Sequence, residues 1–158
     1  MVEQTNTVFT LMQNSYNLGI NINQLIKYIA IVQNETGEKP DESIERFARL
    51  FERINNIWAK DDNKEWNNIK SISEKHEIEL KDQNGKIESF SNVFRIFLHC
   101  YHSFSVFAKS EFITAIAGEN NRDTLLVLAE NYRNNINGIK ADVVSKVAST
   151  MLQLVYNN

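Results

Sequence analysis

Apolar residues recur at intervals of three and four along almost the whole chain, and this spacing constrains the fold more than any other feature of the sequence. Such intervals place side chains on one face of an α-helix. An all-β fold would instead need a turn signal about every 8–12 residues, whereas the chain has one proline and five glycines. The sequence therefore predicts an all-α fold, as a single helical domain over residues 1–158.

Six to seven helices are expected, and several have recognisable starts. These starts are at Asn6, Asn21, Pro40, Asp61 or Asp62, directly after Ser89, at Asn120 or Asn121, and directly after Asn137 and Gly138. Asparagine and aspartate are good N-terminal caps, and a proline suits the first helical turn. In the first helix, Val8, Leu11, Met12 and Tyr16 are predicted to point inward, and Gly19 is predicted to end the segment.

The segment from Phe90 to Ala117 is predicted to form one long central helix, around which the other helices pack. At about 100° per residue its apolar side chains cover an arc of roughly 200°. Phe90, Phe94, Phe97, Tyr101, Phe104 and Ala108 keep an alternating spacing of four and three. This spacing is typical of a packing seam between helices.

One segment breaks the helical spacing and predicts a short β-hairpin near residues 77–89. Residues 76–80 and 86–89 alternate between apolar and polar, and Asp82 to Gly85 lie between them. A glycine in this place favours a tight turn. The hairpin is expected to lie against the helices, because an isolated hairpin is marginally stable. A wing of a winged-helix domain is the alternative.

The cysteine content indicates a reducing compartment, and the charge is unevenly distributed along the chain. The formal net charge is -3, and the segment from Asp61 to Ser89 accounts for it, with eight acidic and five basic residues. Cys100 is the single cysteine, so no internal disulfide can form. The first residues lack the pattern of a signal peptide, and no apolar stretch is long enough to span a membrane. A cytoplasmic location without membrane contact is expected.

Residues that could carry chemistry are few, and neither an enzyme nor a cofactor site is predicted. The chain has no GxGxxG, GxxxxGK[ST], HExxH, CxxC or GxSxG motif. His99 and His102 could share a metal ion if His76 or a glutamate joined them, but surface or interfacial histidines are favoured. Cys100 is predicted to be a buried thiol. The acidic run that starts at Asp61 fits a helix N-terminus better than a calcium loop.

Two basic strips are the most informative polar features. On the third helix the strip comprises Arg46, Arg49, Arg53, Asn56 and Lys60, opposite an apolar face. On the predicted central helix it comprises Arg95, His99, His102 and Lys109, with no acidic residue among them. Positive donors in a line suit contact with a phosphate backbone. An ordinary solvated face, or pairing with nearby acids, is the alternative.

These features favour a non-catalytic helical subunit that acts by contact with protein partners in a larger complex. In size and all-α character the chain resembles the small helical subunits of CRISPR effector complexes. Within this class the more specific hypothesis is a small subunit of a nucleoprotein complex, in which the two basic strips contact the backbone of RNA or single-stranded DNA. The alternative is a protein-only adaptor or an immunity-type inhibitor, which would bind a basic partner through the acidic region from Asp61 to Glu88.

Overall fold

A computed structural model describes residues 2–58, 64–79 and 90–156 of the chain. Within these ranges the protein has eight α-helices and one short 3₁₀ helix, and no β-strand. The α-helices are α1 (Val2–Asn17), α2 (Ile22–Thr36), α3 (Pro40–Trp58), α4 (Lys64–Lys75), α5 (Phe90–Cys100), α6 (Val106–Ala117), α7 (Arg122–Asn135) and α8 (Ala141–Tyr156). The predicted all-α class is confirmed, with one helix more than the highest number expected.

The ends of α1 and α2 and the starts of α2 and α3 lie where their sequence signals indicate, whereas α1 begins at Val2, before the predicted start at Asn6. Gly19 follows α1 with a φ of 78°, a left-handed conformation that favours glycine. Asn21 caps α2 in a capping box: its side chain accepts from the backbone N–H of Gln24, and the Gln24 side chain accepts from the Asn21 N–H. Gly37 ends α2 in the left-handed region, and Pro40 is the first residue of α3.

The prediction of one continuous helix over residues 90–117 is wrong, because the chain breaks between α5 and α6. Tyr101–Ser103 form the 3₁₀ helix, and Phe104 and Ser105 then adopt extended backbone conformations. Serine competes for backbone hydrogen bonds and favours helix ends. Accordingly, Ser103 donates to the Cys100 carbonyl, and the Ser105 side chain accepts from the Ala108 N–H to cap α6.

The break brings aromatic rings together that a straight helix would separate. Phe97 and Phe112 would lie about 22 Å apart along one continuous helix, at 1.5 Å per residue. Their ring centroids are in fact 6.1 Å apart, and the Phe104 ring lies 6.2 Å from Phe97 and 5.8 Å from Phe112. Burial of these rings compensates for the helical hydrogen bonds that the break removes.

The centre of the fold is α3, rather than the predicted central helix. It contacts α1, α2, α4, α6, α7 and α8. Its side chains Phe47, Leu50 and Phe51 are completely buried, and Phe51 meets Phe94 of α5 edge to face. Buried residues of all eight helices belong to one hydrophobic cluster. None of the described helices is long and apolar enough to cross a membrane.

The predicted hairpin near 77–89 is not supported where the structure describes it. Residues Glu77 to Glu79 follow α4 as a turn and an irregular segment, with Glu77 at a φ of 57°. The rest of the predicted hairpin, residues 80–89, lies outside the described residues. Ile78 packs partly buried against the core, so the segment after α4 does lie against the helices.

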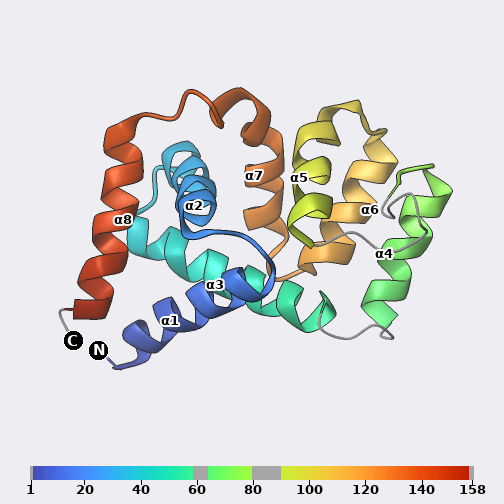
Figure 1. Cartoon of the computed structure of the whole chain (residues 1–158). Helices are drawn as coiled ribbons and strands as arrows, with labels where there is room; N and C mark the ends of the chain where they lie inside the picture. Colours follow the sequence, from blue (N-terminus) through green and yellow to red (C-terminus); the bar gives the residue numbers. More distant parts are fainter. Residues whose placement is uncertain (1, 59–63, 80–89, 157–158) are drawn as a thin grey trace.

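Figure 1 shows how the helices are arranged. The first and last helices, α1 and α8, lie together at the left of the view with the two ends of the chain. At the other side of the molecule, α4 packs against α6, with α5 and α7 between α6 and the left-hand helices.

Candidate contact surfaces

The predicted strip on α3 is largely occupied by contacts within the protein. Arg46 forms an ion pair with Glu38 at 2.9 Å, and the Glu38 side chain is only 10% exposed. Arg49 is exposed, and it lies in a shallow polar groove beside Glu45 and Glu52. Lys60 lies outside the described residues. This helix face therefore offers Arg49 to a partner rather than a line of free arginines.

Arg53 holds the C-terminal end of α6. Its guanidinium donates to the carbonyl oxygens of Ile116 at 3.1 Å and Ala115 at 3.3 Å. The last carbonyls of a helix have no partner within the helix and need such donors. The guanidinium also lies against Gly118, where an added Cβ would be 3.0 Å from its central carbon. Arg53 is thus a helix-capping residue.

The second predicted strip, on α5 and α6, is interrupted by the break in the helix. Arg95 and His102 are exposed. His99 lies edge to face against the Tyr132 ring, and its Nε2 is 3.3 Å from the Tyr132 hydroxyl. Lys109 is partly buried with its Nζ 5.1 Å from the Tyr101 ring centre, a cation–π distance. The four residues do not form one continuous strip.

Two of these residues rest on tyrosines that belong to the core. Burial raises the pKa of Tyr101, and the hydrogen bond that its hydroxyl donates to Glu130 at 2.8 Å raises it further. Burial also raises the pKa of Tyr132, against the opposing effect of Arg95. Both hydroxyls therefore stay protonated at neutral pH, and the Tyr101 hydroxyl donates to Glu130.

The histidines and the cysteine considered for metal binding or nucleophilic chemistry do not combine into a metal site in the described part of the chain. The described part of the chain contains no group of three or more His, Cys, Asp or Glu side chains that could hold a metal ion. Cys100 is exposed, which corrects the prediction of a buried thiol.

The third histidine, His76, follows α4 and lies against Glu111 of α6. Its Nε2 is 3.4 Å from Oε2, an ion-pair distance without hydrogen-bond geometry. Lys75 donates to the other carboxylate oxygen at 3.0 Å, and this hydrogen bond is the main cause that lowers the pKa of Glu111. Together they tie the end of α4 to α6.

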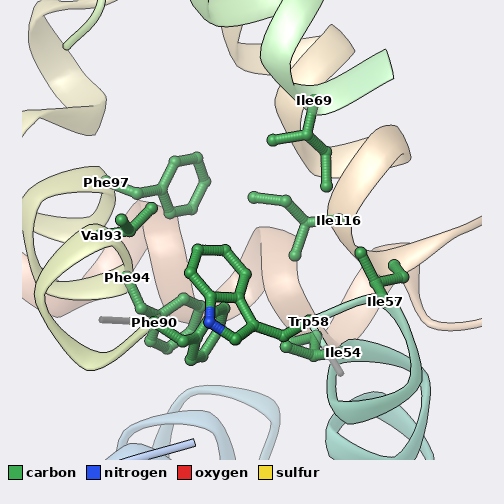
Figure 2. Close-up of a pocket in the computed structure, with 9 residues that line it drawn as sticks. All are labelled: Ile54, Ile57, Trp58, Ile69, Phe90, Val93, Phe94, Phe97 and Ile116. Carbon is green, nitrogen blue, oxygen red and sulfur yellow. The ribbon is translucent and has the colours of Figure 1, made fainter. Parts of the chain in front are cut away.

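An enclosed cavity lies where α3, α4, α5 and α6 meet. Figure 2 shows its lining, which includes Ile54 and Trp58 from α3, Ile69 from α4, Phe94 from α5 and Ile116 from α6. All nine lining residues are apolar, and the volume of about 20 Å³ leaves room for about one water molecule. Water needs two to four polar partners in such a space. This cavity is a packing gap rather than a ligand site.

A much larger hollow, of about 420 Å³, lies on the surface between α1, α2 and α8. We call it the α1/α8 groove, and its ten lining residues are Val8, Phe9, Met12, Ile22, Ile26, Ala148, Met151, Leu152, Val155 and Tyr156. Every one has an apolar or aromatic side chain. Several are unusually exposed: Phe9 is 53%, Leu152 57% and Tyr156 79% accessible to solvent.

The exposed face of α1 continues the groove. Met12 is 39% and Tyr16 80% exposed, which corrects the prediction that both point into the core. Phe9, Met12 and Tyr16 follow a spacing of three and four and therefore share one side of the helix. The neighbouring side, with Val8 and Leu11, is fully buried. Thus α1 is apolar on two sides and buries only one.

The chain segments that line the α1/α8 groove carry no formal charge. Residues 4–26, which include all of its α1 and α2 lining, contain no Asp, Glu, Lys or Arg, and neither do residues 147–158, which include its α8 lining. At about 200 Å² for each large side chain, the exposed fractions of its main side chains and Tyr16 amount to roughly 600–700 Å² of surface. The largest patch on a typical monomer is about 300–600 Å². This surface is the strongest candidate contact site.

A sequence signal for this surface exists, although the helical spacing does not reveal it. Helical spacing counts apolar residues but does not show which of two apolar sides is covered. A scan for charge would have found residues 4–26, 96–108 and 147–158 as the three longest stretches without Asp, Glu, Lys or Arg. Two of them build the α1/α8 groove.

Comparison of the chain with protein-family models, with characterised proteins and with solved structures finds no match.

Proposed function

We propose that the protein is a non-catalytic helical subunit that acts by contact in a larger assembly, with the α1/α8 groove as its main contact surface. The observation that carries this proposal is the uncharged apolar surface of α1, α2 and α8, with Phe9, Leu152 and Tyr156 exposed. Apolar surface in water is unfavourable by about 25 cal/mol per Å². A surface of this size is therefore expected to be covered in the working state.

The chemistry of the groove selects the kind of partner. Phosphate binding needs positive donors, and a basic partner needs carboxylates. The groove provides neither, because none of its ten lining residues carries a formal charge. Its partner is accordingly an apolar, uncharged protein surface. Aromatic anchors in such a surface carry much of the binding free energy.

Nucleic-acid contact remains a second proposal for a different face of the protein. Arg49, Arg95 and His102 are exposed, and they would reach a backbone only through electrostatic contact. Changing Arg49 and Arg95 to glutamate is expected to remove any co-purifying nucleic acid, as judged by the ratio of absorbance at 260 and 280 nm. An unchanged ratio in a preparation that contains nucleic acid would rule these residues out.

The main proposal is tested by the size of the species that contains the protein in its native host. Leu152→Asp introduces a charge into the groove. Gln153→Asp is the matched control, because the neighbouring Gln153 is exposed but is not part of the groove lining. Both changes place the same charge near the end of α8 and share its unfavourable effect on the helix dipole.

The wild type and Gln153→Asp are expected to elute from size-exclusion chromatography well above the 18.3 kDa of one chain. Leu152→Asp is expected to elute as a single folded chain, with an unchanged circular dichroism spectrum. If Leu152→Asp stays in the large species, the groove is not the contact surface. If the wild type elutes as one chain, the protein is not an assembly subunit.

A further inference from the structure

A second exposed apolar site lies at the first turn of α6. Val106 is 78% and Phe107 76% exposed, and with the groove residues and Tyr16 they complete the exposed large hydrophobic side chains of the described chain. Ser105 caps the helix at this point, and Ala108 immediately after it is buried. Val106 and Phe107 therefore project from a fixed helix end. We call this pair the α6 knob.

The α6 knob matches the α1/α8 groove in charge. The knob belongs to residues 96–108, which contain no Asp, Glu, Lys or Arg. The other two of the three longest uncharged stretches line the groove. A charged side chain pressed into an apolar groove would lose its hydration without gaining a partner. An uncharged aromatic side chain gains binding free energy there instead.

The two sites also differ in shape and lie apart on the molecule. The groove is a hollow of about 420 Å³, whereas Val106 and Phe107 project from a helix end. In Figure 1 the groove helices α1 and α8 lie at the left, and the connection from α5 to α6 lies at the upper right. The knob of one molecule cannot fill its own groove, but it can reach the groove of another.

We propose that the α6 knob of one copy of this chain binds the α1/α8 groove of the next copy, in a head-to-tail contact. The inference rests on the proposed function and names the partner of the groove. Pairing two grooves face to face would oppose two hollows and leave Val106 and Phe107 in water. The head-to-tail contact covers Val106 and Phe107 of one copy and part of the groove of the next. Such heterologous contacts build open chains or closed rings of subunits.

The contact is expected to be of modest strength. The smaller side of the contact limits its area: at about 200 Å² for each large side chain, the exposed parts of Val106 and Phe107 amount to roughly 300 Å², well below the ~800 Å² that each partner buries in a standard interface. Weak interfaces form at micromolar and higher protein concentrations, and the fraction of associated chains rises with concentration. Purified wild-type protein should therefore gain mass progressively as its concentration rises.

Sedimentation velocity of the purified wild type and three purified variants tests the proposal. Phe107→Asp removes the knob and leaves the groove intact, and Leu152→Asp does the reverse. Gln153→Asp is again the control. All three positions are exposed, and Asp at position 107 lies in the first turn of α6, where a negative charge is favourable. Unchanged melting temperatures will verify that the variants are folded.

The wild type and Gln153→Asp are expected to form species larger than two chains as concentration rises. Each of the other two variants alone should remain a single chain. An equal mixture of Phe107→Asp and Leu152→Asp should form a species of two chains and nothing larger, because only one intact knob and one intact groove can meet.

Association of Phe107→Asp at the wild-type level would overturn the proposal and show that grooves pair with each other. A wild type that stays a single chain up to millimolar concentration would also overturn it. That second result would leave the proposed function to the size measurement in the native host, which detects any partner of the groove.

Discussion

Replacing Arg53 with methionine tests whether this residue is a structural cap of α6 or a free binding residue. Methionine keeps an apolar stem of similar length but removes the donors to the Ile116 and Ala115 carbonyls. A hydrogen bond from a charged donor contributes about 1.5–3 kcal/mol when well formed. Arg53 is half-buried and its second bond is long, at 3.3 Å. We therefore expect the free energy of unfolding to fall by about 2 kcal/mol in total.

Chemical denaturation with urea and a thermal scan will measure this loss. For a protein of this size, a loss of about 2 kcal/mol lowers the melting temperature by roughly 4–8 °C. Arg49→Met is the matched control on the same helix. Arg49 is exposed beside Glu45 and Glu52, and its replacement should change the free energy of unfolding by no more than about 0.5 kcal/mol.

Equal stability of the two variants would refute the capping role of Arg53. If Arg53→Met also lost nucleic acid that the wild type carries, the basic face of α3 would be a binding strip after all. A large loss of stability with unchanged binding supports the structural role.

Three further predictions follow from local geometry. Gly118→Ala should destabilise by about 2–4 kcal/mol in urea denaturation, because φ +73° and ψ 173° suit only glycine and the added Cβ would displace the capping guanidinium. A Cβ added at Gly37 would meet no other atom, so Gly37→Ala should lower the free energy of unfolding by only about 1 kcal/mol. Equal losses in Gly118→Ala and Gly37→Ala would contradict this explanation. Val93→Ile should fill part of the small cavity and stabilise by about 0.5–1 kcal/mol in the same assay, and a loss would show that the gap cannot take a methylene. Because the pKa of Glu111 is lowered, the contact of Glu111 with Lys75 stabilises the fold above the ordinary carboxyl pKa, and this stabilisation is lost as the pH falls through the lower pKa of the folded state. Lys75→Met should raise the titration midpoint of Glu111 that NMR measures. An unchanged midpoint would exclude this ion pair as the cause of the lowered pKa.

Much of the helical organisation could be predicted, because helix ends are determined by nearby residues. Asn21, Gly37 and Pro40 act within one helical turn, and each is found where its chemistry indicates. The break at residues 101–105 is different. Ser105 is an ordinary cap signal, but it lies within an apolar pattern that continues unchanged through Phe104. Contacts of Phe104 with Phe97 and Phe112, which are made only in three dimensions, favour the break.

Surface residues could not be assigned from spacing alone. Arg53 belongs to a polar helix face by its position, yet it caps a helix that lies more than sixty residues later in the chain. Met12 and Tyr16 fit an apolar face, yet they are exposed because α3 covers only the neighbouring face of α1. In both cases the deciding contact is between distant segments. The absence of charge in residues 4–26 and 147–158 is the sequence property that does predict the contact surface.

Hydroxyl-radical footprinting of the assembly from the native host tests the contact role of the α1/α8 groove most directly. Met12 and Tyr156 are reactive, exposed reporters at the groove, and Met151 is a buried internal reference at 5% exposure. Oxidation of Met12 and Tyr156 is expected to be several-fold slower in the assembly than in the isolated Leu152→Asp chain, whereas oxidation of Met151 should be slow in both. Equal oxidation of Met12 and Tyr156 in the two samples would show that the groove stays open to water in the assembly and would contradict the proposed function.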